Sequence, residues 1–132
     1  MTGGSGFIGG RLIERLVSEG RQVRALARSP AAAERVAALG AEPVRGELAE
    51  VSAMRAGAEG CDWAFHAAAM VGDWGTPEEF ERGNVTGTRN ALEACTQAGV
   101  RRFVHVGTEA ALMAGDPLVE VDETALKEWT RR

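Results

Sequence analysis

A glycine-rich turn at the start of the chain constrains the fold more than any other sequence feature. Residues 3–9 read GGSGFIG, with glycines at positions 4, 6 and 9, and a helical pattern of apolar residues begins at once over 7–19. Glycines at this spacing allow a tight turn, a ligand close to the bare main chain, and a helix packed closely on a sheet. The unpaired amides and positive dipole of such a helix start attract an anion such as a pyrophosphate. With 17 glycines in the chain, the alternative is a helix start that is glycine-rich by chance.

Short apolar runs alternate with helical segments along the rest of the chain. Strands are predicted at residues 22–28, 42–46, 62–68 and 101–107, and helices at residues 7–19, at 30–39, and from a cap at Thr76 to a stop at Gly99. This alternation predicts an α/β fold with a Rossmann-like, doubly wound parallel sheet in one domain, 1–132. In that architecture the glycine turn follows a strand, and only Met1 and Thr2 precede Gly3. We therefore expect an incomplete sheet that lacks its first strand and its C-terminal part.

Arg28 occupies the position that reads the adenosine ribose in dinucleotide-binding folds. It lies at the end of the predicted strand 22–28, 19 positions after Gly9. An acidic residue at this place suits NAD, whereas a basic residue suits the additional 2′-phosphate of NADP. The sequence therefore favours NADP over NAD, with Arg28 as the phosphate partner and Arg11 or Ser29 as helpers. The alternative is an ordinary solvated arginine at the end of a strand.

Composition excludes several other classes of function. A net charge of −4 gives no basic surface for nucleic acid, and the longest nearly apolar run, 64–71, is interrupted by His66 and too short to cross a membrane. Cys61 and Cys95 form neither a disulfide framework nor a metal cluster, which favours buried thiols in a reducing, cytoplasmic setting. His66 and His105 have no second ligand at metal spacing, so we expect core histidines and no metal site.

Several stretches resemble, in order and spacing, the extended short-chain dehydrogenase/reductase family, also called the NAD-dependent epimerase/dehydratase family. Residues 2–9 (TGGSGFIG) resemble its cofactor loop, and residues 65–69 (FHAAA) its strand end beside the adenine. Residues 84–88 (NVTGT) are similar to its helix motif, and residues 102–108 (RFVHVGT) to the strand that delivers an active-site Ser or Thr. Asp122 and Glu123 resemble the acidic pair that follows. The resemblance covers essentially the whole chain.

The resemblance implies roles for particular residues. The implied cofactor-binding residues are Gly3, Gly4, Ser5, Gly6, Phe7, Ile8, Gly9, Arg28, Glu47, Leu48, Ala67, Ala68 and Ala69. Thr108 matches the catalytic Ser/Thr whose hydroxyl donates to the reacting substrate oxygen, although β-propensity alone also explains a threonine there. Asn84 matches a family asparagine behind the site, where a structural role is an equal alternative. The resemblance implies hydride transfer between the nicotinamide and a small-molecule alcohol or ketone, and a homodimer of the full-length protein.

The chain also departs from the family pattern. It reads Gly46-Glu47 where the family has Gly-Asp, and its composition includes no tyrosine, so the YxxxK motif is not among these residues. We expect the chain to be a fragment that, by itself, is unstable and binds dinucleotide weakly or not at all. Residues 68–74 are similar to 3-beta-hydroxysteroid dehydrogenases and dihydroflavonol reductases, with Trp74 as a candidate wall of the substrate pocket. The alternatives are a non-catalytic NAD(P)-sensing module and a methyltransferase.

Overall fold

The computed structural model describes residues 1–72, 74–108 and 122. Within them the strands form two parallel pairs, β1 (Arg24–Ala27) with β2 (Glu42–Arg45), and β3 (Trp63–His66) with β4 (Arg102–His105). Each predicted strand is present and is one to three residues shorter than predicted. The parallel α/β architecture expected from the sequence is thereby confirmed.

Residues 1 and 2 lie between the two strand pairs and join them. The Met1 carbonyl accepts from the amide of Leu26 in β1 (2.9 Å), and the Thr2 amide donates to the carbonyl of Phe65 in β3 (2.9 Å). Thr2 forms a parallel bridge with His66, so the chain runs in the same direction as the strands on either side. The glycine turn that follows therefore emerges at the edge of the sheet where the strands have their carboxyl ends.

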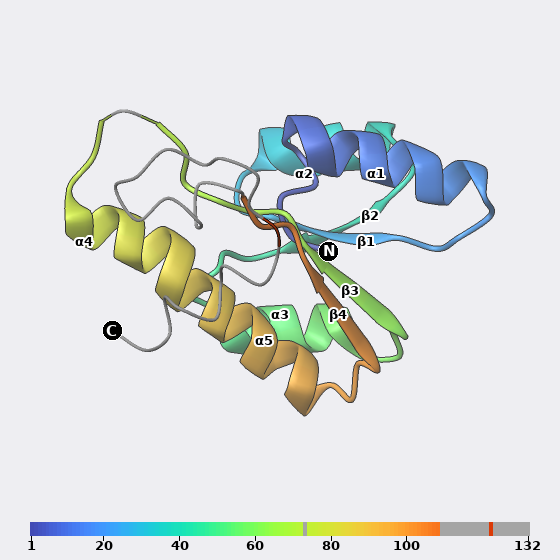
Figure 1. Ribbon diagram of the computed structural model, residues 1–132. Coiled ribbons are helices and arrows are strands. Elements are labelled where there is room, and N and C mark those ends of the chain that lie inside the picture. The colour runs from blue at the N-terminus through green and yellow to red at the C-terminus, as the bar shows by residue number, and fades with distance from the viewer. Residues whose placement is uncertain (73, 109–121, 123–132) are drawn as a thin grey trace.

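Helices cover both faces of the strands (Figure 1). On one face α1 (Phe7–Ser18) and α2 (Pro30–Ala38) enclose a core that contains Ile13, Ala25 and Val36. On the other face α3 (Val51–Ala58) packs against α5 (Gly87–Gln97) around Met54, Ala91 and Ala94. Helices on opposite faces of parallel strands define the doubly wound arrangement.

The ends of the helices follow local chemistry that the sequence contains. The Ser29 hydroxyl accepts from the Ala32 amide at the start of α2, and Thr76 and Glu79 form a reciprocal capping box at the start of α4 (Pro77–Phe80). Gly20 and Gly99 follow the ends of α1 and α5 with φ of +76° and +73°. A side chain strains such a left-handed backbone, and glycine does not.

Two helical features differ from the prediction. The single helix expected between Thr76 and Gly99 contains a π-helical section, η1 (Glu81–Thr86), between α4 and α5. The helix α3 was not predicted at all, because its eight residues are few and include Gly57, which weakens the helical signal. The packing requires that glycine, since a β-carbon there would lie 2.8 Å from Val44 Cγ1 on β2.

Within the described residues, no helix is long and apolar enough to span a membrane. Nor do three or more His, Cys, Asp or Glu side chains gather there in a way that could hold a metal ion.

Candidate functional site

The glycine turn is packed so closely that Gly3 and Gly9 leave no room for a side chain. Gly3 has φ of +72°, and a β-carbon there would lie 2.5 Å from the Ala67 carbonyl. A β-carbon on Gly9 would lie 2.0 Å from the Gly3 carbonyl oxygen, whereas one on Gly4 would meet the Ile13 side chain at 2.9 Å. The turn therefore lies directly against the carboxyl end of β3, and its tightness depends on main-chain contacts.

The first turn of α1 presents unpaired amides at this edge. The intrahelical bonds begin with the Gly10 amide, which donates to the Gly6 carbonyl (2.9 Å). The N-cap residue is Gly6, which has no side chain to accept from the first amides of the helix. The amides of Phe7, Ile8 and Gly9 are the groups that a helix start leaves without an intrahelical acceptor. The Phe7 and Ile8 side chains beside these amides are exposed. Such a site suits an anion.

A buried hydrogen-bonded chain fixes the base of the turn. The Thr2 hydroxyl lies 2.7 Å from His66 Nδ1, and His66 Nε2 lies 3.0 Å from the Thr88 hydroxyl on α5. The Ala68 amide also donates to Thr2 Oγ1 (3.4 Å), which ties the segment after β3 to the same hydrogen-bonded chain. Burial, with a smaller contribution from the nearby His105, lowers the pKa of His66 to about 4. His66 is thus neutral at pH 7 and has a structural role, as predicted for a core histidine. His105, which was also expected in the core, is exposed.

Arg28 follows β1 at the same edge of the sheet. It lines a pocket of about 380 Å³ together with Arg45, Gly46, Glu47 and Glu50. The helpers that the sequence suggested have other partners: Arg11 forms an ion pair with Glu14 (3.0 Å), and Ser29 caps α2. Arg45 is a second arginine that lines this pocket, and sequence spacing alone did not identify it.

The segment after β2 is held by an asparagine that the sequence analysis missed. Asn90 on α5 donates from its side-chain amide to the Leu48 carbonyl (2.8 Å), and the Leu48 side chain packs against the core around Met54. Glu47 is exposed, and its amide donates to the Glu50 carboxylate (3.1 Å). No helical spacing relates Asn90 to Asn84, so no sequence pattern identified it.

Asn84 holds the segment after β3 in the same manner. In the π-helical section, its side-chain oxygen accepts from the Met70 amide (2.8 Å), and its side-chain nitrogen donates to the Met70 carbonyl (3.0 Å). These two hydrogen bonds to the Met70 main chain position the segment that begins with Ala67, Ala68 and Ala69. The geometry gives Asn84 a positioning role, the structural alternative that its sequence left open.

Replacing Asn84 with alanine is expected to free this segment. Both bonds to Met70 are lost, which costs about 2 kcal/mol of unfolding free energy. Hydrogen exchange should show a large loss of protection at the Met70 amide, with little change at the amides of β1. Asn90→Ala is the matched control, because it releases the Leu48 carbonyl and leaves Met70 bonded. Unchanged protection at Met70 in Asn84→Ala would contradict the positioning role.

Of the other predicted residues, Trp74 follows the carboxyl end of β3 and Thr108 that of β4. Thr108 is exposed, three residues beyond the end of β4. Trp74 and Val71 are both 90% exposed in the segment between β3 and α4. Asp122 is exposed, and Glu123, its partner in the predicted acidic pair, lies outside the described residues.

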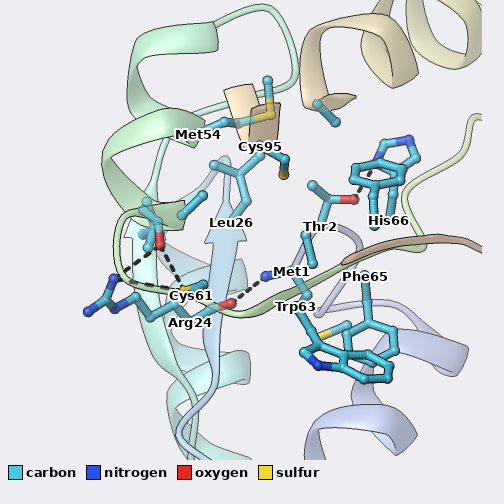
Figure 2. Close-up of a pocket in the computed structure, with 16 residues that line it drawn as sticks. Met1, Thr2, Arg24, Leu26, Met54, Cys61, Trp63, Phe65, His66 and Cys95 are labelled. Atoms are coloured by element: carbon cyan, nitrogen blue, oxygen red, sulfur yellow. Dashed lines mark hydrogen bonds between the residues drawn. The ribbon is translucent and has the colours of Figure 1, made fainter. Parts of the chain in front are cut away.

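A second cavity lies between the strands and the helices α3 and α5, and it extends to the amino ends of β1 and β3 (Figure 2). It has a volume of about 50 Å³ and lies next to Met1, Arg24 and Cys61. The Arg24 guanidinium there already donates to the Glu59 carbonyl (2.7 Å), and its Nε lies 3.4 Å from a Glu42 carboxylate oxygen. Burial raises the pKa of the Cys95 thiol on the same wall. With its arginine engaged and its thiol neutral, this cavity offers no site for a dinucleotide phosphate.

Comparison with known proteins identifies relatives of this chain. The NAD(P)H-binding family matches residues 3–132. A ketoreductase of Stigmatella aurantiaca, named for 4-hydroxy-2-methyl-3-oxo-4-farnesyl-3,4-dihydroquinoline-1-oxide, is 48% identical over 94% of this chain and 37% of its own length. A 3-beta-hydroxysteroid dehydrogenase of Mycolicibacterium neoaurum is 36% identical over 94% of this chain and 35% of its own.

A solved structure shows the same arrangement. The short-chain dehydrogenase/reductase superfamily protein of Agrobacterium tumefaciens, crystallised with bound NAD, superposes with a TM-score of 0.73 at 29% identity, over 90% of this chain and 35% of that protein. The chain thus spans about a third of the length of the curated relatives and of this solved structure. These matches decide against the methyltransferase alternative.

Proposed function

This chain belongs to the NAD(P)H-binding family, within the extended short-chain dehydrogenase/reductases, and from that premise we propose that its protein is an NADP-dependent oxidoreductase or epimerase. In this proposal the cofactor pyrophosphate binds the amides at the start of α1, and the adenosine end extends toward Arg28. NADP supplies or accepts the hydride when it is bound. The proposed reaction interconverts an alcohol and a ketone of a small-molecule substrate.

The observation that carries the proposal is the uncapped start of α1 at the carboxyl edge. The glycine turn leads into it, the buried Thr2–His66–Thr88 chain fixes it, and Arg28 lies on the pocket beyond it. Ligands of open α/β sheets bind at this edge. At the other cavity, the Arg24 guanidinium donates to the Glu59 carbonyl and the Met1 ammonium donates to the Arg24 carbonyl, so both cations are engaged.

For the substrate, we propose an apolar ketone on a ring system. The exposed Val71 and Trp74 offer apolar surface in the segment after β3, where substrates bind in this fold. Two relatives carry names that specify a dihydroquinoline ketoreductase and a hydroxysteroid dehydrogenase. Within the proposal, the Thr108 hydroxyl donates to the ketone oxygen as negative charge develops there.

Replacing Arg28 with alanine tests the cofactor assignment. A charge-assisted bond to phosphate contributes about 1.5–3 kcal/mol, so NADPH affinity should fall about 10- to 100-fold while NADH affinity stays within about twofold. Calorimetric titration of the protein, expressed at the full length that its gene encodes, measures both. A wild-type protein that binds neither NADPH nor NADH would refute the proposed function. Equal losses for NADPH and NADH in Arg28→Ala would refute the 2′-phosphate contact.

A further inference from the structure

A second arginine faces the pocket at the carboxyl ends of β1 and β2. Arg45, the last residue of β2, is in register with Ala27, so it lies beside the position immediately before Arg28. Adjacent strands are about 4.8 Å apart, and the two side chains line the same pocket together with Glu47 and Glu50. The pairing of β1 with β2 therefore brings to one pocket two arginines that are 17 positions apart in sequence.

Among the residues that the structure describes, neither guanidinium has an ion-pair partner. The ion pairs of the described residues involve Arg11, Arg15, Arg24 and Arg101, and do not include Arg28 or Arg45. Both side chains are exposed at the pocket. Of the two carboxylates, that of Glu50 accepts from the Glu47 amide (3.1 Å), so one of its oxygens faces the turn after β2.

Arg45 determines whether the pocket has a net negative charge. Two arginines and two glutamates sum to zero, and the loss of one arginine leaves a net charge of −1. A pocket with net negative charge repels a phosphate dianion but accepts the neutral hydroxyls of an unphosphorylated ribose. Arg28 alone would therefore face two carboxylates, and phosphate binding requires a second cation.

We propose that Arg45 is a specificity-determining residue that binds the 2′-phosphate of NADP together with Arg28. The inference rests on the proposed function and deepens it. Each guanidinium presents a planar fork of N–H donors, which matches the oxygens of a phosphate monoester. Arg28 and Arg45 approach the phosphate from neighbouring strands, and their charge offsets that of Glu47 and Glu50.

The test is a set of titrations with the protein at its full encoded length. The probes are NADPH, NADH, adenosine 2′-monophosphate and adenosine 5′-monophosphate. Arg45→Gln should weaken NADPH and adenosine 2′-monophosphate at least tenfold and leave NADH and adenosine 5′-monophosphate within twofold. Arg45→Lys should recover part of the loss. Arg35→Gln, which removes an exposed arginine from α2, is the matched control and should change every affinity less than twofold.

The outcomes separate this inference from the function on which it rests. Equal weakening of NADPH and NADH by Arg45→Gln, or no change in either, overturns the role of Arg45 and leaves the oxidoreductase proposal standing. If the wild-type protein binds neither dinucleotide, the proposed function fails, and the 2′-monophosphate titrations still decide whether Arg45 binds a phosphate monoester. A wild-type protein that does not discriminate between the two monophosphates also overturns the inference.

Discussion

Replacing Gly9 with alanine is expected to abolish dinucleotide binding and to destabilise the fold. The new β-carbon would lie 2.0 Å from the Gly3 carbonyl oxygen and 2.9 Å from the Gly4 α-carbon, and neither main-chain atom can move without opening the turn. Such overpacking costs about 2–4 kcal/mol of unfolding free energy. Because the displaced amides are those proposed to hold the pyrophosphate, the affinity for NADPH should fall at least about 100-fold. Urea unfolding and calorimetric titration measure the two effects.

Gly10→Ala is the matched control for this substitution. A β-carbon on Gly10 would lie 3.4 Å from Leu39 Cδ1, which is an ordinary contact, and alanine favours a helix over glycine by about 1 kcal/mol. We therefore expect an unchanged NADPH affinity and an equal or slightly higher stability. Normal NADPH binding by Gly9→Ala would show that the pyrophosphate is not held at this turn.

The second large effect is expected on acidification, through His66. Its pKa is about 4 in the folded protein, against about 6.5 in an unfolded chain, so the unfolded state binds more protons as the pH falls below 6.5. The stability that neutral His66 provides is complete above pH 6.5 and is lost progressively toward pH 4. Between pH 7 and pH 5 this loss amounts to about 2 kcal/mol. Urea unfolding at a series of pH values measures it.

Two variants separate the contribution of His66 to the pH dependence of stability from the contribution of the carboxylates. His66→Gln should be less stable at pH 7 but should lose little further stability between pH 7 and pH 5. His105→Gln should retain most of the pH dependence, because burial of His66 is the larger cause of its lowered pKa. An equally steep loss of stability in His66→Gln would contradict the assignment of this titration to His66.

The features that were predictable from the sequence depend on local chemistry. The glycine turn, the Ser29 cap, the capping box of Thr76 and Glu79, and the stops at Gly20 and Gly99 each involve residues that are close in sequence. Short-range patterns therefore predicted the α/β fold and the order of most elements. Helix α3 was missed because the reason for its Gly57 is not local. The glycine makes room for Val44 on β2, which is distant in sequence.

The parts of the site that were missed depend on contacts between distant residues. Asn90 bonds to Leu48, 42 positions away, and Arg45 meets Arg28 only because β1 pairs with β2 in one particular register. Arg11 was suggested as a phosphate helper, but it pairs with Glu14 one helical turn away. Spacing along the chain cannot rank such alternatives, because they are decided by packing and by competition among charged groups.

The central claim is that a dinucleotide binds with its pyrophosphate on the amides at the start of α1. Nuclear magnetic resonance of the isotope-labelled protein, at its full encoded length and titrated with NADPH, tests this claim most directly. The largest amide shifts should occur at Ser5, Phe7, Ile8 and Gly9, with further shifts at the Arg28 guanidinium. Shifts concentrated around Met1, Arg24 and Cys61 at the amino edge, or none at the glycine turn at saturating NADPH, would contradict it.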